Sequence, residues 1–140
     1  GRTRGIALME GYGTSMAQVA EVSVSGGRIR VHRIVVAADL GRVVNPNIVR
    51  QQLESSINYG VSALVNEVTL RDGRVEQTNF HDYQVLRISE SPAIEMHVVD
   101  SDEKPAGIGE PGTALVGPAV ANAVFAATGQ RLRRLPLKLA

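Results

Sequence analysis

The sequence predicts an α+β fold, with an antiparallel or mixed sheet and two main helices. Residues 20–24 alternate apolar and polar side chains, which is typical of a half-buried strand. Residues 49–64 place apolar side chains three and four positions apart, which is typical of one face of a helix. The chain has 140 residues, of which 44% are hydrophobic, so residues 1–140 suit a single domain.

Strand patterns separated by turns fill the first part of the chain. Residues 5–24 indicate strands interrupted at residues 11–14. Gly26-Gly27 lies between alternating runs and favours the tight turn of a two-residue hairpin. Residues 34–38 are continuously apolar, as an interior strand would be. Asp39-Leu40-Gly41 ends this strand, and Asp39 is expected to cap the turn.

A helix is expected to begin at Asn45-Pro46, because Asn is a favoured N-cap and Pro suits the first helical position. Gly60 lies on the apolar face and predicts close packing there. Beside the apolar face runs a stripe of small and polar residues. It consists of Gln52, Ser56, Tyr59 and Ala63.

The second half predicts a hairpin, a further strand and a second helix. Asp72-Gly73 between short alternating runs is a hairpin signal. Residues 94–98 alternate as a strand does. The second helix is expected from about Pro118 to Thr128, with Gly129 just past its end. Because this helix is apolar all round, we expect it to be buried on all sides.

Composition excludes several classes of function. The net charge of +1 is too balanced to favour nucleic acid or a membrane surface as partner. The absence of cysteine excludes disulfides, iron–sulfur clusters and thiolate zinc sites within this chain. The three histidines show no metal-ligand spacing, so no metal ligand is predicted.

The main candidate for catalysis is the glycine-rich stretch 107–113, which carries one carboxylate, Glu110. A carboxylate on a rigid loop can serve as a general base, because base catalysis requires a positioned group. A plain surface turn explains the same pattern. The glycines also spell G-x-G-x-x-G, but a charged segment precedes them and no acidic residue follows at the required distance. A dinucleotide site is therefore rejected.

Taken together, these segments resemble one family along nearly the whole chain. The chain is similar to the C-terminal part of the molybdopterin-binding large subunit of the xanthine dehydrogenase/aldehyde oxidase family. Within that family it most resembles bacterial isoquinoline 1-oxidoreductase β subunits and related aldehyde dehydrogenases. The segments that carry the resemblance are Asp39-Leu40-Gly41, Asn45-Pro46, Gln52-Leu53-Glu54, Asn79-Phe80, Asp82-Tyr83, Gly107-Ile108-Gly109-Glu110-Pro111, residues 119–123 and residues 127–136.

The resemblance implies an oxidoreductase of the molybdenum hydroxylase type. In that family a glutamate removes a proton from a hydroxyl ligand of the molybdenum centre, which implies that Glu110 is the base. Gln52 and Gly109 are implied as residues beside the molybdopterin, in its cytosine dinucleotide form. Ser55-Ser56 stands where the family usually has Gly-Gly. These two side chains either narrow the approach of the cofactor or form hydrogen bonds within the helix.

The resemblance also implies partners. These are the remainder of the large subunit, an iron–sulfur small subunit that holds the other electron carriers, and a small aldehyde or N-heterocyclic substrate. The chain lacks an initiator Met, and we expect a fragment that is inactive alone and associates with itself through residues 114–127 or their neighbours. The alternative is a non-catalytic module for subunit interaction. The compartment, cytoplasmic or periplasmic, stays open.

Overall fold

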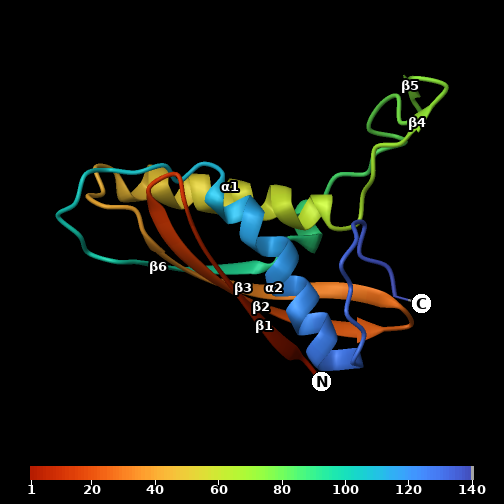
Figure 1. Ribbon diagram of the computed structural model, residues 1–140, viewed down its shortest axis with the longest axis horizontal. Helices are drawn as coiled ribbons and strands as arrows, with labels where there is room; N and C mark the ends of the chain where they lie inside the picture. Colours follow the sequence, from red (N-terminus) through yellow and green to blue (C-terminus); the bar gives the residue numbers. More distant parts are fainter. Residues whose placement is uncertain (140) are drawn as a thin grey trace.

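Three consecutive strands form an antiparallel meander in the computed structural model, which describes residues 1–139 (Figure 1). They are β1 (Thr3–Gly11), β2 (Thr14–Ser25) and β3 (Arg28–Asp39). Tight turns join them, and each turn needs two successive residues with positive φ. Tyr12 and Gly13 have φ of 60° and 78°, and Gly26 and Gly27 have 55° and 73°. These values match the turns that suit two-residue hairpins, so the predicted breaks are confirmed.

The sheet becomes mixed at its fourth strand. β6 (Ala93–Val98) lies beside β3 and runs parallel to it, which gives the order β1-β2-β3-β6. Parallel neighbours require a long crossover. Helix α1 (Pro46–Ala63) and the segment after it form that crossover. The predicted fold class, a mixed sheet with two main helices, is confirmed.

Helix α1 begins where the sequence predicts. The Asn45 side chain accepts hydrogen bonds from the backbone N–H groups of Asn47 and Ile48, at 3.0 and 3.2 Å. Pro46 occupies the first turn, where its missing N–H is not needed. The predicted apolar face is buried, and it comprises Val49, Leu53, Ile57, Gly60, Val61 and the helix-capping Leu64.

Helix α2 spans Pro111–Thr128, so the predicted start near Pro118 was wrong by about two turns. Pro111 opens the helix at a position that needs no N–H. Pro118 lies inside the helix on its exposed side, where water can solvate the carbonyl that loses its partner. Gly117 precedes it and lacks the Cβ that would crowd the proline ring.

The expectation that this second helix is buried on all sides was also wrong. Leu115, Val116 and Val120 face inward, whereas Ala114, Pro118, Ala126 and Ala127 are exposed. Small apolar side chains are readily tolerated at a surface, so hydropathy alone did not define the buried face. Within residues 1–139, neither helix is long and apolar enough to span a membrane.

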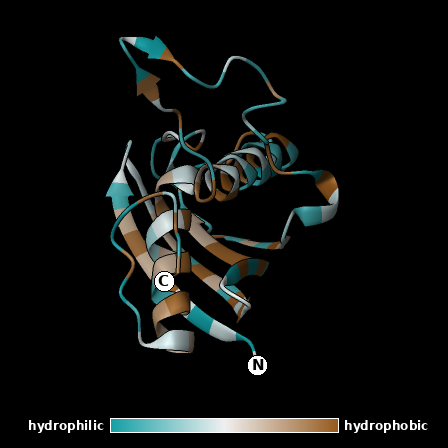
Figure 2. Cartoon of the chain, turned by 90° about the vertical axis from the view of Figure 1, so that its right-hand side faces the viewer, coloured by the Kyte–Doolittle hydropathy of each residue, from teal (hydrophilic) through white to brown (hydrophobic). Residues whose placement is uncertain are grey.

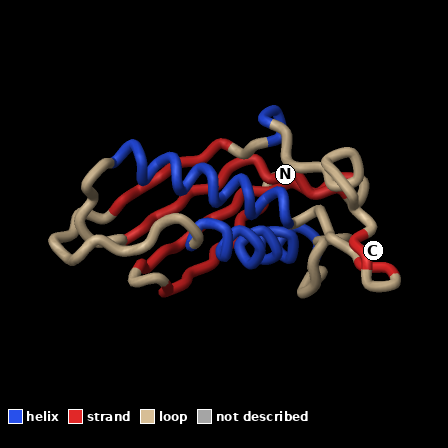
Figure 3. Tube along the Cα trace, turned by 90° about the horizontal axis from the view of Figure 1, so that it is seen from above, coloured by secondary structure: helices blue, strands red, loops and turns tan. Residues whose placement is uncertain are grey.

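The core lies between the helices and one face of the sheet (Figures 2 and 3). Helix α2 packs across β1 and β2, and α1 packs against α2. Gly5 of β1 permits this close approach, because a Cβ there would collide with the α2 backbone at Ala119 and Ala123. Alternate side chains of the central strand β2 are fully buried beneath α2. They include Met16, Gln18, Ala20 and Val22.

A short hairpin projects away from the sheet at the upper right of Figure 1. It consists of β4 (Leu70–Arg71) and β5 (Arg74–Val75). Asp72 and Gly73 between them have φ of 50° and 74°, so the hairpin predicted at Asp-Gly is confirmed with shorter strands. A 3-10 turn, η1 (Ile88–Glu90), follows before β6.

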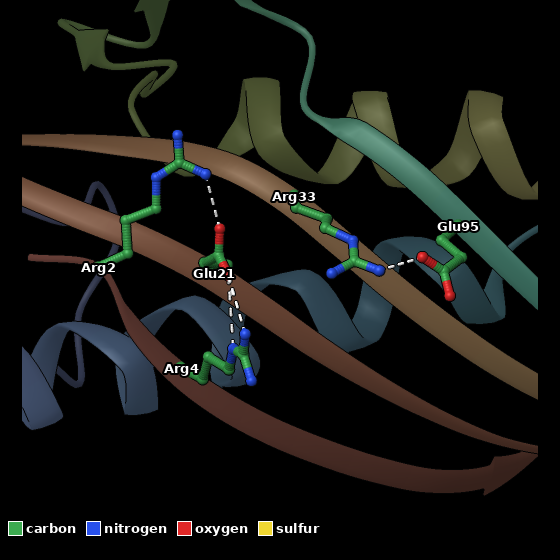
Figure 4. A network of polar contacts seen from close by, with 5 residues as sticks. All are labelled: Arg2, Arg4, Glu21, Arg33 and Glu95. Atoms are coloured by element: carbon green, nitrogen blue, oxygen red, sulfur yellow. Dashed lines mark hydrogen bonds and ion pairs between the residues drawn. The ribbon is translucent and has the colours of Figure 1, made fainter.

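The face of the sheet opposite the helices carries an ionic network (Figure 4). Glu21 of β2 pairs with Arg2 at 2.8 Å and with Arg4 at 3.4 Å. Arg33 of β3 pairs with Glu95 of β6. The register aligns Arg4, Glu21 and Arg33 across three strands. The Arg4–Glu21 pair joins β1 to β2, and the Arg33–Glu95 pair joins β3 to β6.

Acid should weaken the fold through this network. The hydrogen bond from Arg2 lowers the pKa of Glu21, and the hydrogen bond from Arg33 lowers the pKa of Glu95. A carboxylate whose pKa is depressed in the fold stabilises it above the ordinary carboxyl pKa. That stabilisation is lost as pH falls through the folded-state pKa. The Glu21→Gln/Glu95→Gln variant should therefore lose less thermal stability than the parent between about pH 7 and about pH 3.

The comparison is made by thermal unfolding. Glu67→Gln, at an exposed carboxylate outside the network, serves as control and should keep the acid sensitivity of the parent. Equal acid sensitivity in the double variant and the parent would show that Glu21 and Glu95 are not the source of the acid sensitivity.

Candidate functional site

The glycine-rich loop lies between β6 and α2, and β2 holds its first end. The Thr14 hydroxyl donates a hydrogen bond of 2.6 Å to the Gly107 carbonyl oxygen. The Gly107 N–H donates to the Tyr12 carbonyl oxygen at 3.0 Å. Thr14 is 1% exposed, so its bond is shielded from water. The loop therefore starts from a fixed point on the turn between β1 and β2.

The second end of the loop is held by both β2 and α1. Gln18 Nε2 donates a hydrogen bond of 2.9 Å to the Gly112 carbonyl oxygen. The Thr113 hydroxyl donates to the Ser56 carbonyl oxygen at 2.9 Å. A Cβ at Gly112 would collide with the Ser56 hydroxyl, so a larger residue would force the Ser56 side chain to shift. The first turn of α2 is thus fixed on two sides.

The segment preceding this loop is tied to the end of β3. The Arg42 N–H donates to Glu103 O at 2.9 Å, and the Ala106 N–H donates to Leu40 O at 2.8 Å. The Asp39 carboxylate accepts a bond from the Gly41 N–H at 3.2 Å, which confirms that it caps the predicted turn.

Glu110 stands between the two fixed ends, at the N-cap position of α2. Its side chain is exposed and caps no backbone N–H group. Within residues 1–139 it forms no hydrogen bond or ion pair with another side chain. A carboxylate at a helix N-terminus is favoured by the helix dipole. The site therefore presents an uncommitted carboxylate on a backbone held in place.

Gln52 lies next to this loop. A Cβ built on Gly109 would be 3.6 Å from Gln52 Oε1. Both residues are exposed, so the Gln52 amide and the Gly109 backbone are open to a ligand. The structure thus brings together the three predicted site residues, Gln52, Gly109 and Glu110, from α1 and from the loop.

Ser56 is buried, unlike Gln52 and Tyr59 of the same polar stripe of α1. Ser56 is 4% exposed, and its hydroxyl donates to the Leu53 carbonyl oxygen at 3.1 Å. Of the two expectations for Ser56, the hydrogen bond within the helix is therefore the one observed. Ser55, Gln52 and Tyr59 are exposed, whereas Ser56 lies under α2. The stripe is therefore not one continuous exposed surface.

The histidines lie outside this site. Among residues 1–139 no three or more His, Asp or Glu side chains form a group suited to a metal ion. Partial burial, followed by the charges of Arg2 and Arg30, lowers the pKa of His32, and its Nε2 shares a 2.7 Å hydrogen bond with Ser23. The other two lie beside single carboxylates, His81 by Asp82 and His97 by Glu95.

Sequence reasoning missed Thr14 and Gln18, the two β2 side chains that hold the loop. The signal that would have found Gln18 is its register. It occupies an inward position of β2 between two apolar inward residues, Met16 and Ala20. A buried amide at such a position needs a hydrogen-bond partner. Thr14 follows the turn and gives no comparable signal.

The arrangement suits a ligand that needs close backbone approach and a base beside it. Glycine at position 109 leaves the space beside the Gln52 amide open, and the amide can donate and accept hydrogen bonds. Glu110 can accept a proton at its free carboxylate. These residues can together contact one side of a polar ligand and accept a proton from it.

The chain matches known proteins over most of its length. Residues 5–92 match the molybdopterin cofactor-binding domain family. The chain is 38% identical over 99% of its length to the isoquinoline 1-oxidoreductase subunit beta of Brevundimonas diminuta, and covers 18% of that protein. It is also 38% identical to the membrane-bound aldehyde dehydrogenase [pyrroloquinoline-quinone] of Gluconacetobacter polyoxogenes, over 86% of this chain and 16% of that protein.

The fold has a counterpart among solved structures. The aldehyde oxidoreductase from Desulfovibrio desulfuricans ATCC 27774 superposes with a TM-score of 0.74 at 26% identity. The match covers 88% of this chain and 14% of that chain. This chain thus spans less than a fifth of each of these three relatives.

The contact between Gly112 and Ser56 can be tested by substitution. Gly112→Ala should destabilise the fold by about 1–3 kcal/mol, because the new methyl group overpacks a filled site. In a Ser56→Gly background the same substitution should cost much less, since both the hydroxyl and its Cβ are gone. Thermal unfolding of the four proteins measures this coupling. Additive losses would show that the two residues do not compete for space.

Proposed function

Because the chain belongs to the family of molybdopterin cofactor-binding domains, we propose that it is part of a molybdenum hydroxylase. In this proposal Glu110 is the general base, and Gln52 and Gly109 form one side of the cofactor site. The parent protein would oxidise an aldehyde or hydroxylate an N-heterocycle with oxygen taken from water. The names of the relatives, which include an isoquinoline oxidoreductase and an aldehyde oxidoreductase, support this range of substrates.

The observation that carries the proposal is the free carboxylate of Glu110 on a loop held at both ends. General bases act efficiently when their position is fixed and their proton-accepting atoms are available. Hydrogen bonds at Gly107 and Gly112 supply the first condition, and the exposure of Glu110 supplies the second. Glu110 would accept the proton that is released as oxygen is transferred to the substrate.

The remaining site residues would bind the cofactor. Gln52 would form hydrogen bonds to it through its exposed amide, and Gly109 would allow it to approach the backbone. When bound, molybdopterin, here proposed in the cytosine dinucleotide form, supplies the oxidising chemistry. In this proposal, iron–sulfur clusters on a small subunit would receive the electrons. This chain itself has no cysteine that could hold such a cluster.

The chain would act within a longer subunit, as its C-terminal part, and would be inactive alone. Its relatives are more than five times its length, which supports this proposal. Ser55-Ser56, which stands where the family usually has Gly-Gly, would favour the alternative of a non-catalytic interaction module. The inward hydrogen bond of Ser56 weakens that argument, because this hydroxyl does not point at the approach to Gly109.

The role of Glu110 is tested on the full complex. Glu110→Gln keeps the size of the side chain and removes the base, so turnover should fall by roughly 10²–10⁴-fold. Bound molybdenum should stay at the level of the parent. The control is Glu103→Gln, a second exposed carboxylate on the same connection, which should retain full turnover. Full turnover of Glu110→Gln would refute the assignment.

Self-association of the isolated chain remains a prediction, and the structure suggests a surface for it. Ile6 and Leu8, on the outer face of β1, are 61% and 74% exposed. In a longer subunit such apolar side chains would be covered. We expect the isolated chain to dimerise at high concentration, and Ile6→Lys/Leu8→Lys to be monomeric.

Sedimentation velocity measures this. Ala126→Lys changes the exposed side of α2. If this variant still dimerises, the outer face of the sheet is the contact surface, and if it is monomeric, the 114–127 surface is. A parent that is strictly monomeric at high concentration would contradict self-association by either surface.

A further inference from the structure

We propose that Thr14 and Gln18 of β2 are positioning residues for Glu110. In this inference, which rests on the proposed function, β2 acts as a clamp that holds both ends of the catalytic loop. Thr14 fixes the loop at Gly107, and Gln18 fixes it at Gly112. Neither residue touches the carboxylate of Glu110. Both act through the backbone that carries it.

The clamp follows from strand geometry. Residues four apart in a strand point to the same face, so Thr14 and Gln18 both face α2 and the loop. Both are buried, at 1% and 0% exposure. Their acceptors, Gly107 and Gly112, lie on either side of Glu110 in the sequence. One rigid strand therefore sets the distance between the two ends of the six-residue span 107–112.

Gln18 lowers the stability of this core. Its Oε1 is buried without a hydrogen-bond partner among residues 1–139. An unpaired buried acceptor lowers stability, whereas an apolar side chain of similar size would avoid that loss. Its other polar end forms the bond to Gly112. The retained amide is therefore best explained by what that bond does for the loop.

The position of the Glu110 side chain depends on the backbone of the loop that carries it. Its side chain has no hydrogen bond within residues 1–139, so its position follows the backbone of residues 107–112. A displacement of about 1 Å in a reacting group can lower a rate by about 10²-fold. Loosening either end should therefore reduce the rate of the step in which Glu110 takes part.

The experiment uses the assembled complex that contains this chain. Thr14→Val keeps the shape of the side chain and removes its hydroxyl, whereas Thr14→Ser restores a hydroxyl. Gln18→Met keeps the length and removes the donor. Hydrogen exchange of the 107–113 segment is measured on the cofactor-free complex, which gives a readout independent of turnover. kcat and KM are then measured on the loaded complex.

We expect Thr14→Val and Gln18→Met to speed exchange of the 107–113 segment about fivefold, while exchange in the rest of β2 and in β3 stays unchanged. Each should lower kcat at least about tenfold and leave KM within about twofold. Thr14→Ser should restore the parental exchange rate of the 107–113 segment and the parental kcat. In a Glu110→Gln background, Thr14→Val should cause no further loss of kcat, because the residue it positions is already gone.

Three results would overturn the clamp. The first is parental exchange and parental kcat in both variants. The second is faster exchange throughout β2 and β3, which would indicate a general structural role. The third is an equal loss of kcat from Thr14→Val in the Glu110→Gln background. Full turnover of Glu110→Gln alone would instead refute the base assignment, and exchange of the 107–113 segment would still decide whether the loop is held.

Discussion

The close contact between α1 and the first turn of α2 is the constraint on which the site depends. A Cβ at Gly60 would lie 2.9 Å from Val116 Cγ2, and a Cβ at Gly112 would collide with Ser56. Glycine at both positions lets the helices approach until the Thr113 hydroxyl bonds to Ser56 O. Because the helices meet here, Gln52 of α1 lies beside Gly109 in the loop that leads into α2.

The same packing holds the loop backbone in place and leaves the Glu110 carboxylate free. The loop is anchored by buried groups on β2 and α1, whereas its single carboxylate faces solvent. A base that formed a salt bridge or capped its own helix would have its lone pairs occupied. Here hydrogen bonds to the backbone fix the position of the loop, and the Glu110 side chain forms none of them. The buried, unpaired Oε1 of Gln18 indicates that some stability is given up for this arrangement.

Local chemistry explains which features were predictable. Gly-Gly and Asp-Gly turns require positive φ, and Asn45-Pro46 satisfies the first N–H groups of a helix, so these elements could be located from neighbouring residues alone. The start of α2 could not, because Pro111 and Gly112 are typical of both a loop and a helical first turn. Pro118 resembled a helix start, but it lies inside α2. The carbonyl group that it leaves without an N–H partner, that of Ala114, is on the solvent side of the helix.

The sequence by itself determined the hairpins, the first helix and the glycine-rich loop with Glu110, since each depends on short-range backbone preferences. Its resemblance to molybdopterin-binding subunits, which the family match confirms, also pointed to Gln52 and Gly109. Only the tertiary structure decided that β6 runs parallel to β3, that Ser56 turns inward, and that Thr14 and Gln18 reach the loop. The bonds of Thr14 and Gln18 join residues 93 and 94 positions apart, and no local pattern encodes such a separation.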